Sequence, residues 1–171
     1  ARDHALASIP VLTTDQRGVP ISGNPDIGAY ETGVPSTFTA WNFERFSGEA
    51  RFDQDADGDG LAEGLAFATS ADASGCSSGL LSVAPEADGS FHLRYPFRSG
   101  AKGLQYSIES SSGLDGVWNR IHCLNPDDLA MTNSDGVESS IDPACPWIKV
   151  TDGRTHSQRE FWRLKVESTT P

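Results

Sequence analysis

The chain has few cysteines, few basic residues and no long apolar run, and each shortage argues against a class of protein. Its 171 residues include 3 cysteines, an odd number that suits a complete disulfide framework poorly. Lys and Arg total 13 against 24 Asp and Glu, so the formal charge is −11. This charge argues against a nucleic-acid or anionic-membrane partner, because phosphate binding needs a basic surface. No apolar run approaches the roughly 20 residues of a membrane span, so membrane insertion is not expected.

The remaining composition favours a β-rich globular chain. Hydrophobic residues make up 37% and charged residues 22%, which is typical of a folded rather than a disordered protein. The 17 glycines and 10 prolines indicate many turns. The first residues, Ala1-Arg2-Asp3-His4, are polar and lack the apolar segment of a signal peptide, so we expect a mature or excised piece.

Residues 1–35 contain short apolar runs separated by glycine and proline, and we expect an extended arm there. The run TTDQRGVPISGNPDIGAYE in this arm resembles the closing motif of secreted bacterial parallel β-helix proteins, which are adhesin-type surface proteins. In such proteins the motif completes the last coil of the helix. The resemblance implies a strand with an unpaired edge that seeks a partner. The apolar residues expected to make this contact are Val11, Leu12, Ile21, Ile27 and Tyr30.

Residues 36–79 are expected to form a short helix, an acidic loop, a second short helix over 61–68 and a linker. Ser36 or Thr37 is a suitable N-cap for the first helix. Its aromatic residues recur at roughly helical spacing. They are Phe38, Trp41, Phe43 and Phe46.

The acidic run DQDADGDGL, residues 53–61, predicts a calcium loop. Calcium takes six to eight oxygen ligands, and alternate carboxylates in a tight turn converge on one point. Asp55, Asp57 and Asp59 fit positions 1, 3 and 5 of an EF-hand-like loop, followed by glycine at position 6. The backbone carbonyl of Leu61 would supply position 7.

The loop departs from the EF-hand pattern at position 12, where Ala66 replaces the usual carboxylate. Two repairs are open: Asp53 coordinates from upstream, or Glu63 coordinates directly rather than through water. Either repair implies weak affinity, and a solvated acidic turn without an ion is the alternative. With calcium bound, we expect the loop to fix the angle between the two helices. The predicted metal-site residues are Asp53, Asp55, Asp57, Asp59, Leu61 and Glu63.

Residues 80–171 read as an Ig-like antiparallel β-sandwich. Apolar and polar residues alternate over 91–97, 104–109 and 163–166, and Asp-Gly pairs mark turns between such runs. Cys123 and Cys145 lie beside Pro and Asp in turn-like sequence, and we expect them to form a disulfide. Cys76 lies in a Gly/Ser-rich stretch and is either free or replaces one member of that pair.

Several short motifs occur here in an order that is similar to a C-terminal module of large secreted bacterial proteins. They are the aromatic helix, DQDADGDGLAEGLAFA, LQYSIESSSGLDGVW and the closing FWRLKV. The module is frequent in Verrucomicrobia-like and Planctomycetes-like sequences, and it joins a calcium-type loop to a small Ig-like sandwich. The resemblance covers about residues 36–168. It implies an extracellular structural or attachment role rather than a catalytic one.

No catalytic motif fits its sequence context, so we do not expect an enzyme. Residues 75–79, GCSSG, match a nucleophile elbow in letters only, because no helix is expected after them. Asp127 and Asp128 are interpreted as a solvated loop. The four histidines show no metal-ligand spacing with one another or with cysteine. They are His4, His92, His122 and His156.

Two functions from different classes are consistent with these features. The first is a calcium-stabilised, non-catalytic adhesion or structural module at the cell surface, which self-associates or binds a neighbouring domain. Strand addition by the arm would do this, and head-to-tail repetition would build a filament. The alternative is a carbohydrate-binding accessory module of a larger secreted enzyme, with exposed tryptophans stacked on a polysaccharide, although such residues more often belong to the core. The tryptophans are Trp41, Trp118, Trp147 and Trp162.

Overall fold

The computed structural model describes residues 35–69, 80–142, 146–156 and 159–169. The chain divides into two compact units, one ending at Phe67 and the other beginning at Ala68. The five apolar residues predicted for the arm lie outside the described residues, as do Cys76 and Cys145.

The first helix, α1 (Phe38–Phe46), forms as its aromatic spacing predicts. The Thr37 hydroxyl accepts a hydrogen bond from the Ala40 N–H at 3.2 Å, so Thr37 rather than Ser36 is the N-cap. Ser47 ends the helix in a left-handed conformation, with φ of 55°. The buried Asn42 then pairs with both backbone groups of Ala50, at 2.7 and 3.1 Å, and turns the chain back along the helix.

Aromatic rings form the core of the first unit. The Phe38 ring contacts three others, with ring centroids 5.1 Å from Phe52, 5.9 Å from Trp41 and 6.0 Å from Phe67. The second helix, α2 (Glu63–Thr69), begins two residues later than predicted. Gly64 faces the Phe52 ring so closely that a Cβ atom would overlap it, and the glycine thereby permits this helix to approach the ring.

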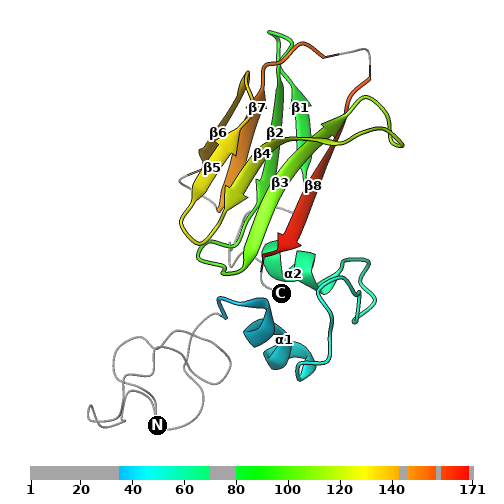
Figure 1. Cartoon of the computed structure of the whole chain (residues 1–171), viewed down its shortest axis with the longest axis vertical. Helices are drawn as coiled ribbons and strands as arrows, with labels where there is room; N and C mark the ends of the chain where they lie inside the picture. The colour runs from blue at the N-terminus through cyan, green and yellow to red at the C-terminus, as the bar shows by residue number, and fades with distance from the viewer. Residues whose placement is uncertain (1–34, 70–79, 143–145, 157–158, 170–171) are drawn as a thin grey trace, which may run out of the picture. The chain divides into compact units, whose positions relative to one another are not determined.

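The second unit is a β-sandwich of two four-stranded antiparallel sheets, as the alternating sequence predicts (Figure 1). One sheet has the order β1-β2-β7-β6 and the other β5-β4-β3-β8. The first sheet comprises β1 (Ser82–Pro85), β2 (Phe91–Pro96), β7 (Trp147–Asp152) and β6 (Val137–Ile141). The second comprises β5 (Ala130–Asn133), β4 (Asn119–Asn125), β3 (Leu104–Ser111) and β8 (Phe161–Ser168).

The strand order is that of an Ig-type sandwich. When the strands are lettered in chain order with C′ and C″ after C, the sheets read A-B-E-D and C″-C′-C-F. In that fold, strand G lies beside strand F, which is β8 here. Fully buried side chains from both sheets fill the space between them. They include Leu93, Tyr95, Tyr106, Ile108, Leu124, Ile148 and Val150.

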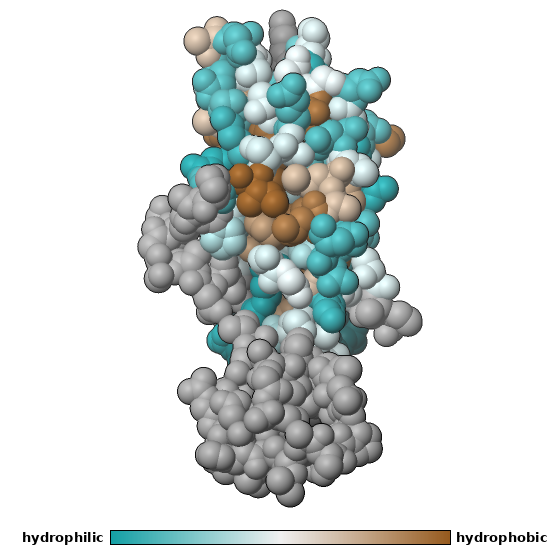
Figure 2. All heavy atoms as spheres, turned by 90° about the vertical axis from the view of Figure 1, so that its left-hand side faces the viewer, coloured by the Kyte–Doolittle hydropathy of each residue, from teal (hydrophilic) through white to brown (hydrophobic). Residues whose placement is uncertain are grey.

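The two sheets meet where β5 and β6 lie side by side, and Figure 2 faces this side of the molecule. Hydrophobic side chains gather midway along it, between hydrophilic ones. The Asn133 amide donates to the Ser139 hydroxyl at 2.9 Å and so ties β5 to β6. This side of the sandwich is closed by the protein's own strands.

A buried polar chain also crosses between the sheets. The Tyr95 hydroxyl, on β2, lies 2.7 Å from His122 Nε2, on β4, and His122 Nδ1 lies 2.7 Å from the Asn133 side-chain oxygen. Because the amide oxygen only accepts, His122 donates from Nδ1. In the neutral ring, Nε2 then accepts from the Tyr95 hydroxyl. Burial lowers the pKa of His122, and the hydrogen bond to Asn133 opposes this only in part.

The neutral His122 makes the stability of the sandwich sensitive to acid. The unfolded chain takes up a proton at His122 below about pH 6.5, whereas the folded chain does so only at lower pH. We therefore expect the free energy of unfolding to fall as pH decreases from 7 to 5.5. The His122→Gln variant should show a shallower slope in urea titrations across this range. Equal slopes for the two proteins would contradict the neutral assignment, whatever the variant's absolute stability.

Candidate metal centre and a buried ion pair

The acidic loop of the first unit is closed by backbone hydrogen bonds at its base. The Glu63 N–H donates to the Gln54 carbonyl at 2.7 Å, and the Gly64 N–H donates to the Phe52 carbonyl at 2.8 Å. Residues 55–62 therefore form a compact loop whose two ends are fixed beside each other. This closure brings Glu63, the first residue of α2, next to the aspartates that precede it.

Inside the loop, carboxylates accept hydrogen bonds from the backbone. The two oxygens of Asp55 accept from Gly58 at 2.8 Å and from Gly60 at 3.0 Å, and both glycines have positive φ, +75° and +92°. Asp59 accepts from the Leu61 N–H at 2.8 Å. Glycine suits these turns because L-residues with a side chain are strained at positive φ. These bonds curl the loop around Asp55.

Asp55, Asp57 and Glu63 form a group that could hold a metal ion. One carboxylate oxygen from each lies within 4.8 Å of the other two. Two oxygens that both lie at calcium's ligand distance of about 2.3–2.6 Å are separated by at most about 5 Å. The three oxygens therefore fit around one hard cation, whose other ligands would have to come from further oxygens such as water.

Glu63 is the unusual member of this group because it is 1% exposed, whereas the two aspartates are exposed. Its Oε1 accepts from the Ala56 N–H at 3.0 Å, which leaves further lone pairs for a ligand. The Arg45 guanidinium lies 3.9 Å from the Asp57 carboxylate. Three carboxylates this close repel one another, and a cation between them would offset that repulsion.

The other predicted carboxylate ligands, Asp53 and Asp59, do not belong to this group, and coordination by the Leu61 carbonyl stays a prediction. Asp53 forms an exposed ion pair with Arg51 at 3.1 Å, and Asp59 caps Leu61. Of the two repairs that the sequence left open, the geometry therefore favours Glu63 over Asp53. Ala66, at the position of the missing EF-hand carboxylate, lies within α2.

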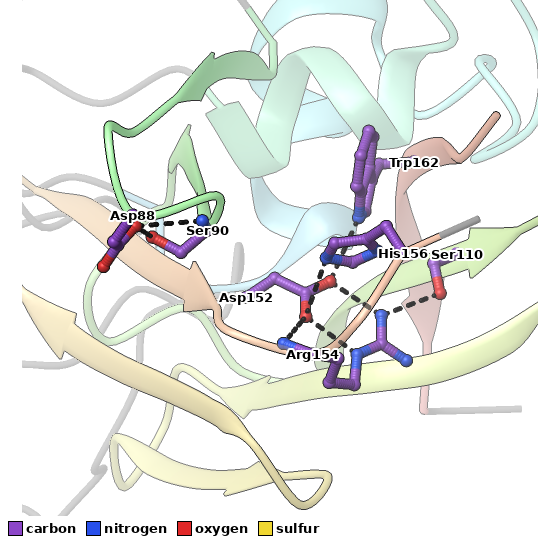
Figure 3. A network of polar contacts seen from close by, with 7 residues as sticks. All are labelled: Asp88, Ser90, Ser110, Asp152, Arg154, His156 and Trp162. Carbon is purple, nitrogen blue, oxygen red and sulfur yellow. Dashed lines mark hydrogen bonds and ion pairs between the residues drawn. The ribbon is translucent and has the colours of Figure 1, made fainter. Parts of the chain in front are cut away.

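The second unit contains a buried ion pair that sequence reasoning did not find (Figure 3). Asp152, the last residue of β7, is fully buried. Its carboxylate accepts from Arg154 Nε at 2.8 Å and Nη2 at 2.7 Å, and from the Trp162 ring N–H at 3.3 Å. Arg154 Nη2 also donates to the Ser110 hydroxyl, on β3, at 3.1 Å. The pair thus joins β7 of one sheet to β3 and β8 of the other.

The surroundings of Asp152 keep it charged. Burial alone would raise its pKa, but the hydrogen bonds and charge of Arg154, with the Trp162 N–H, hold the pKa below its usual value. His156 Nε2 lies 3.5 Å from the same carboxylate. The His156 and Trp162 rings and the ring of Phe91 pack together, with centroids 4.8–5.5 Å apart.

The sequence interpretation placed Asp152 in an Asp-Gly turn, as it did Asp88. Asp88 is in such a turn: its carboxylate accepts from the Ser90 N–H and hydroxyl, which lowers its pKa (Figure 3). Asp152 differs because Arg154 and Trp162 reach its carboxylate. The only signal of this contact in the sequence is Arg154, two positions after Asp152. A basic residue at that distance from an aspartate is common in turns.

The predicted disulfide between Cys123 and Cys145 is not formed in this structure. Cys123 is a free, half-buried thiol in the middle of β4, paired in register with Ser107 and Thr132, rather than in a turn. Burial raises the pKa of its thiol. The turn-like neighbours of Cys123 in the sequence begin only at the end of this strand.

The tryptophans and the described histidines have local partners. Trp41 and Trp147 are buried, and the Arg163 guanidinium lies 4.2 Å from the centre of the Trp118 ring. None of the four tryptophans, all within the described ranges, is exposed. His92 pairs with Glu86 at 2.6 Å.

Comparison with known proteins leaves the family of this chain open. A scan against protein-family models and a search of curated proteins each return no match. The resemblance to bacterial surface proteins therefore stays a prediction. Among the helices that the structure describes, none is long and apolar enough to cross a membrane.

Proposed function

We propose that this chain is a non-catalytic structural module of an extracellular bacterial surface protein, and that calcium stabilises its first unit. The observation that carries the proposal is the convergence of Asp55, Asp57 and Glu63 within 4.8 Å. An almost fully buried carboxylate beside two others is costly without a cation, and this supports a bound ion over a solvated acidic turn.

Calcium suits this site better than magnesium or a transition metal. Every candidate side-chain ligand is a carboxylate oxygen, and no His or Cys belongs to the group. Calcium tolerates irregular loops and six to eight oxygens, whereas magnesium demands a near-ideal octahedron. Both oxygens of Asp55 also accept hydrogen bonds from the backbone of the loop. Ion binding at Asp55 would therefore depend on the loop conformation, and the ion would in turn stabilise that conformation.

The structural role is supported by the way the sandwich uses its polar groups. Tyr95 and His122 pair with each other between the sheets, and Asp152 pairs with Arg154. These groups serve internal hydrogen bonds rather than a shared cleft with a nucleophile and a base. Assembly through the arm is a further part of the proposal, which rests on the sequence because residues 1–34 lie outside the described ranges.

Thermal unfolding with and without calcium tests the proposed function. Calcium loops of extracellular modules bind with dissociation constants of about 0.1–1 mM, so 10 mM calcium should stabilise the first unit by about 1.4–2.7 kcal/mol. We expect a melting temperature several degrees higher than in chelator, and slower proteolysis within residues 53–61. The proposal fails if calcium changes neither the melting temperature nor the rate of cleavage.

A further inference from the structure

The outer edge of β8 is the longest open strand edge in the part of the chain that the structure describes. β8 pairs with β3 along all eight residues without a register shift, from Phe161 opposite Ser111 to Ser168 opposite Leu104. No described strand pairs with its other side, and in Figure 1 it runs along the margin of its sheet. In an Ig-type sandwich this is the place of strand G. The edge therefore offers a full row of backbone donors and acceptors.

The other edges are blocked or closed. β1 has only four residues, is exposed along its length and ends in Pro85, which lacks a backbone donor. β5 and β6 lie against each other on the opposite side of the sandwich. β8, by contrast, contains neither proline nor glycine and has no bulge. It lacks most of the devices that keep edge strands from pairing.

The inward-facing residues of β8 are only partly covered. Trp162, Leu164 and Val166 point to the same face as Tyr106 and Ile108 of the neighbouring β3. The two β3 residues are fully buried, whereas the three on β8 remain half-buried. A further strand beside β8 would cover this apolar row.

We propose that β8 of a second copy takes this place, antiparallel to the first, so that the two sheets join across a two-fold axis at Lys165. In this register, Leu164 lies opposite Val166 of the partner subunit, so the apolar residues of the two strands lie side by side on the inward face. On the outward face, Arg163 lies opposite Glu167 of the partner. Both contacts occur twice because of the symmetry.

The charges of this strip support self-pairing in a chain whose formal charge is −11. Within one copy, Arg163 pairs with Glu109 at 2.6 Å, and Lys165 pairs with Glu167 at 2.7 Å. Two positive and two negative side chains make the strip neutral, so two copies meet there without the repulsion of their other surfaces. The two Lys165 ammonium groups meet at the axis. Their mutual repulsion is offset because each already contacts Glu167 of its own copy.

Neighbouring registers fit less well. An axis at Leu164 would place Arg163 opposite the partner's Lys165 twice, with like charges facing each other. An axis between two neighbouring residues would place the apolar side chains of one strand opposite the charged side chains of its partner. An axis at Val166 would place Lys165 opposite the partner's Glu167, but it would pair only residues 164–168 and set Leu164 opposite Ser168. The register at Lys165 is favoured because it pairs residues 162–168, places opposite charges across from each other and aligns the two apolar rows.

Sedimentation of the whole chain over a range of concentrations tests the proposal. We expect a monomer–dimer equilibrium for the wild-type chain. Glu167→Arg places like charges opposite each other twice, and should weaken the dimer by about tenfold or more. Glu138→Arg makes the same change in net charge at an exposed position on β6, and should leave the equilibrium unchanged.

Cysteine cross-linking tests the register itself. In a chain whose three native cysteines are replaced with serine, Lys165→Cys should oxidise to a covalent dimer, because paired residues on the axis lie within disulfide range. Lys149→Cys, on the central strand β7, should not. The proposal is overturned by a monomer at all concentrations, which would follow if another segment of the same chain covers β8. Longer assemblies that Glu167→Arg leaves intact would equally overturn it, since they would show pairing at a different edge.

Discussion

Replacing Asp152 with alanine is expected to lower the free energy of unfolding of the sandwich by about 3–5 kcal/mol. Asp152 is fully buried, and its carboxylate is the partner of Arg154 Nε and Nη2 and of the Trp162 N–H. Its removal leaves a partly buried guanidinium without its counter-charge and breaks the link from β7 to β8. Urea titrations of the two proteins measure the difference.

An exposed ion pair provides the matched control for Asp152. Arg94 and Asp142 lie 3.0 Å apart with half-exposed side chains, and Asp142→Ala should cost no more than about 1 kcal/mol. Asp152→Asn keeps the shape of the side chain and removes its charge. Its loss in free energy of unfolding should lie between those of Asp152→Ala and Asp142→Ala. Similar losses for Asp152→Ala and Asp142→Ala would show that the buried pair contributes no more than a surface pair.

The pH dependence of the Asp152 contribution has a defined sign. The pKa of Asp152 is lowered in the folded chain, so its contribution is complete above the unfolded-state value of about 3.9 and is lost as pH falls through the folded-state value. This loss occurs at lower pH than the one expected for His122. The wild-type chain should therefore lose stability in two steps on acidification, and Asp152→Asn should lack the second.

Replacing Glu63 with glutamine is expected to have opposite effects with and without calcium. Without the ion, the exchange relieves repulsion among three carboxylates within 4.8 Å and keeps an acceptor for the Ala56 N–H, so the melting temperature should not fall. With calcium, the variant should lose most of the gain of about 1.4–2.7 kcal/mol expected for the wild-type chain. Thermal unfolding of both proteins in calcium and in chelator separates these effects.

Asp53 provides the control for Glu63, because it lies in the same acidic run but pairs with Arg51 outside the group. Asp53→Asn removes the same charge and should keep the full calcium response. A response lost in Asp53→Asn and kept in Glu63→Gln would contradict this ligand set and would favour coordination from upstream of the loop.

Local features of the fold were predictable because neighbouring residues determine them. Aromatic spacing and Thr37 predict α1, and alternation predicts β2, β3 and β8. The acidic loop was predicted as a candidate cation site because its carboxylates are close in sequence. The preference for Glu63 over Asp53 could not be predicted, because it depends on where α2 begins and on the backbone hydrogen bond between Gln54 and Glu63.

Features that depend on distant residues escaped prediction. Asp152 is followed by glycine like any turn aspartate, and only the folded positions of Arg154 and Trp162 make it a buried anion. Cys123 is adjacent in space to Ser107 and Thr132, which no cysteine spacing reveals. The open edge of β8 likewise follows from the strand order, which local alternation does not determine.

Equilibrium dialysis against radioactive calcium tests the central claim most directly, because it counts bound ions without reference to stability. We expect one calcium ion per chain, with a dissociation constant of about 0.1–1 mM, and much weaker binding by Glu63→Gln. A wild-type chain that binds no calcium at millimolar concentrations, or a Glu63→Gln variant that binds it equally well, would contradict the assignment of Asp55, Asp57 and Glu63 as a calcium site.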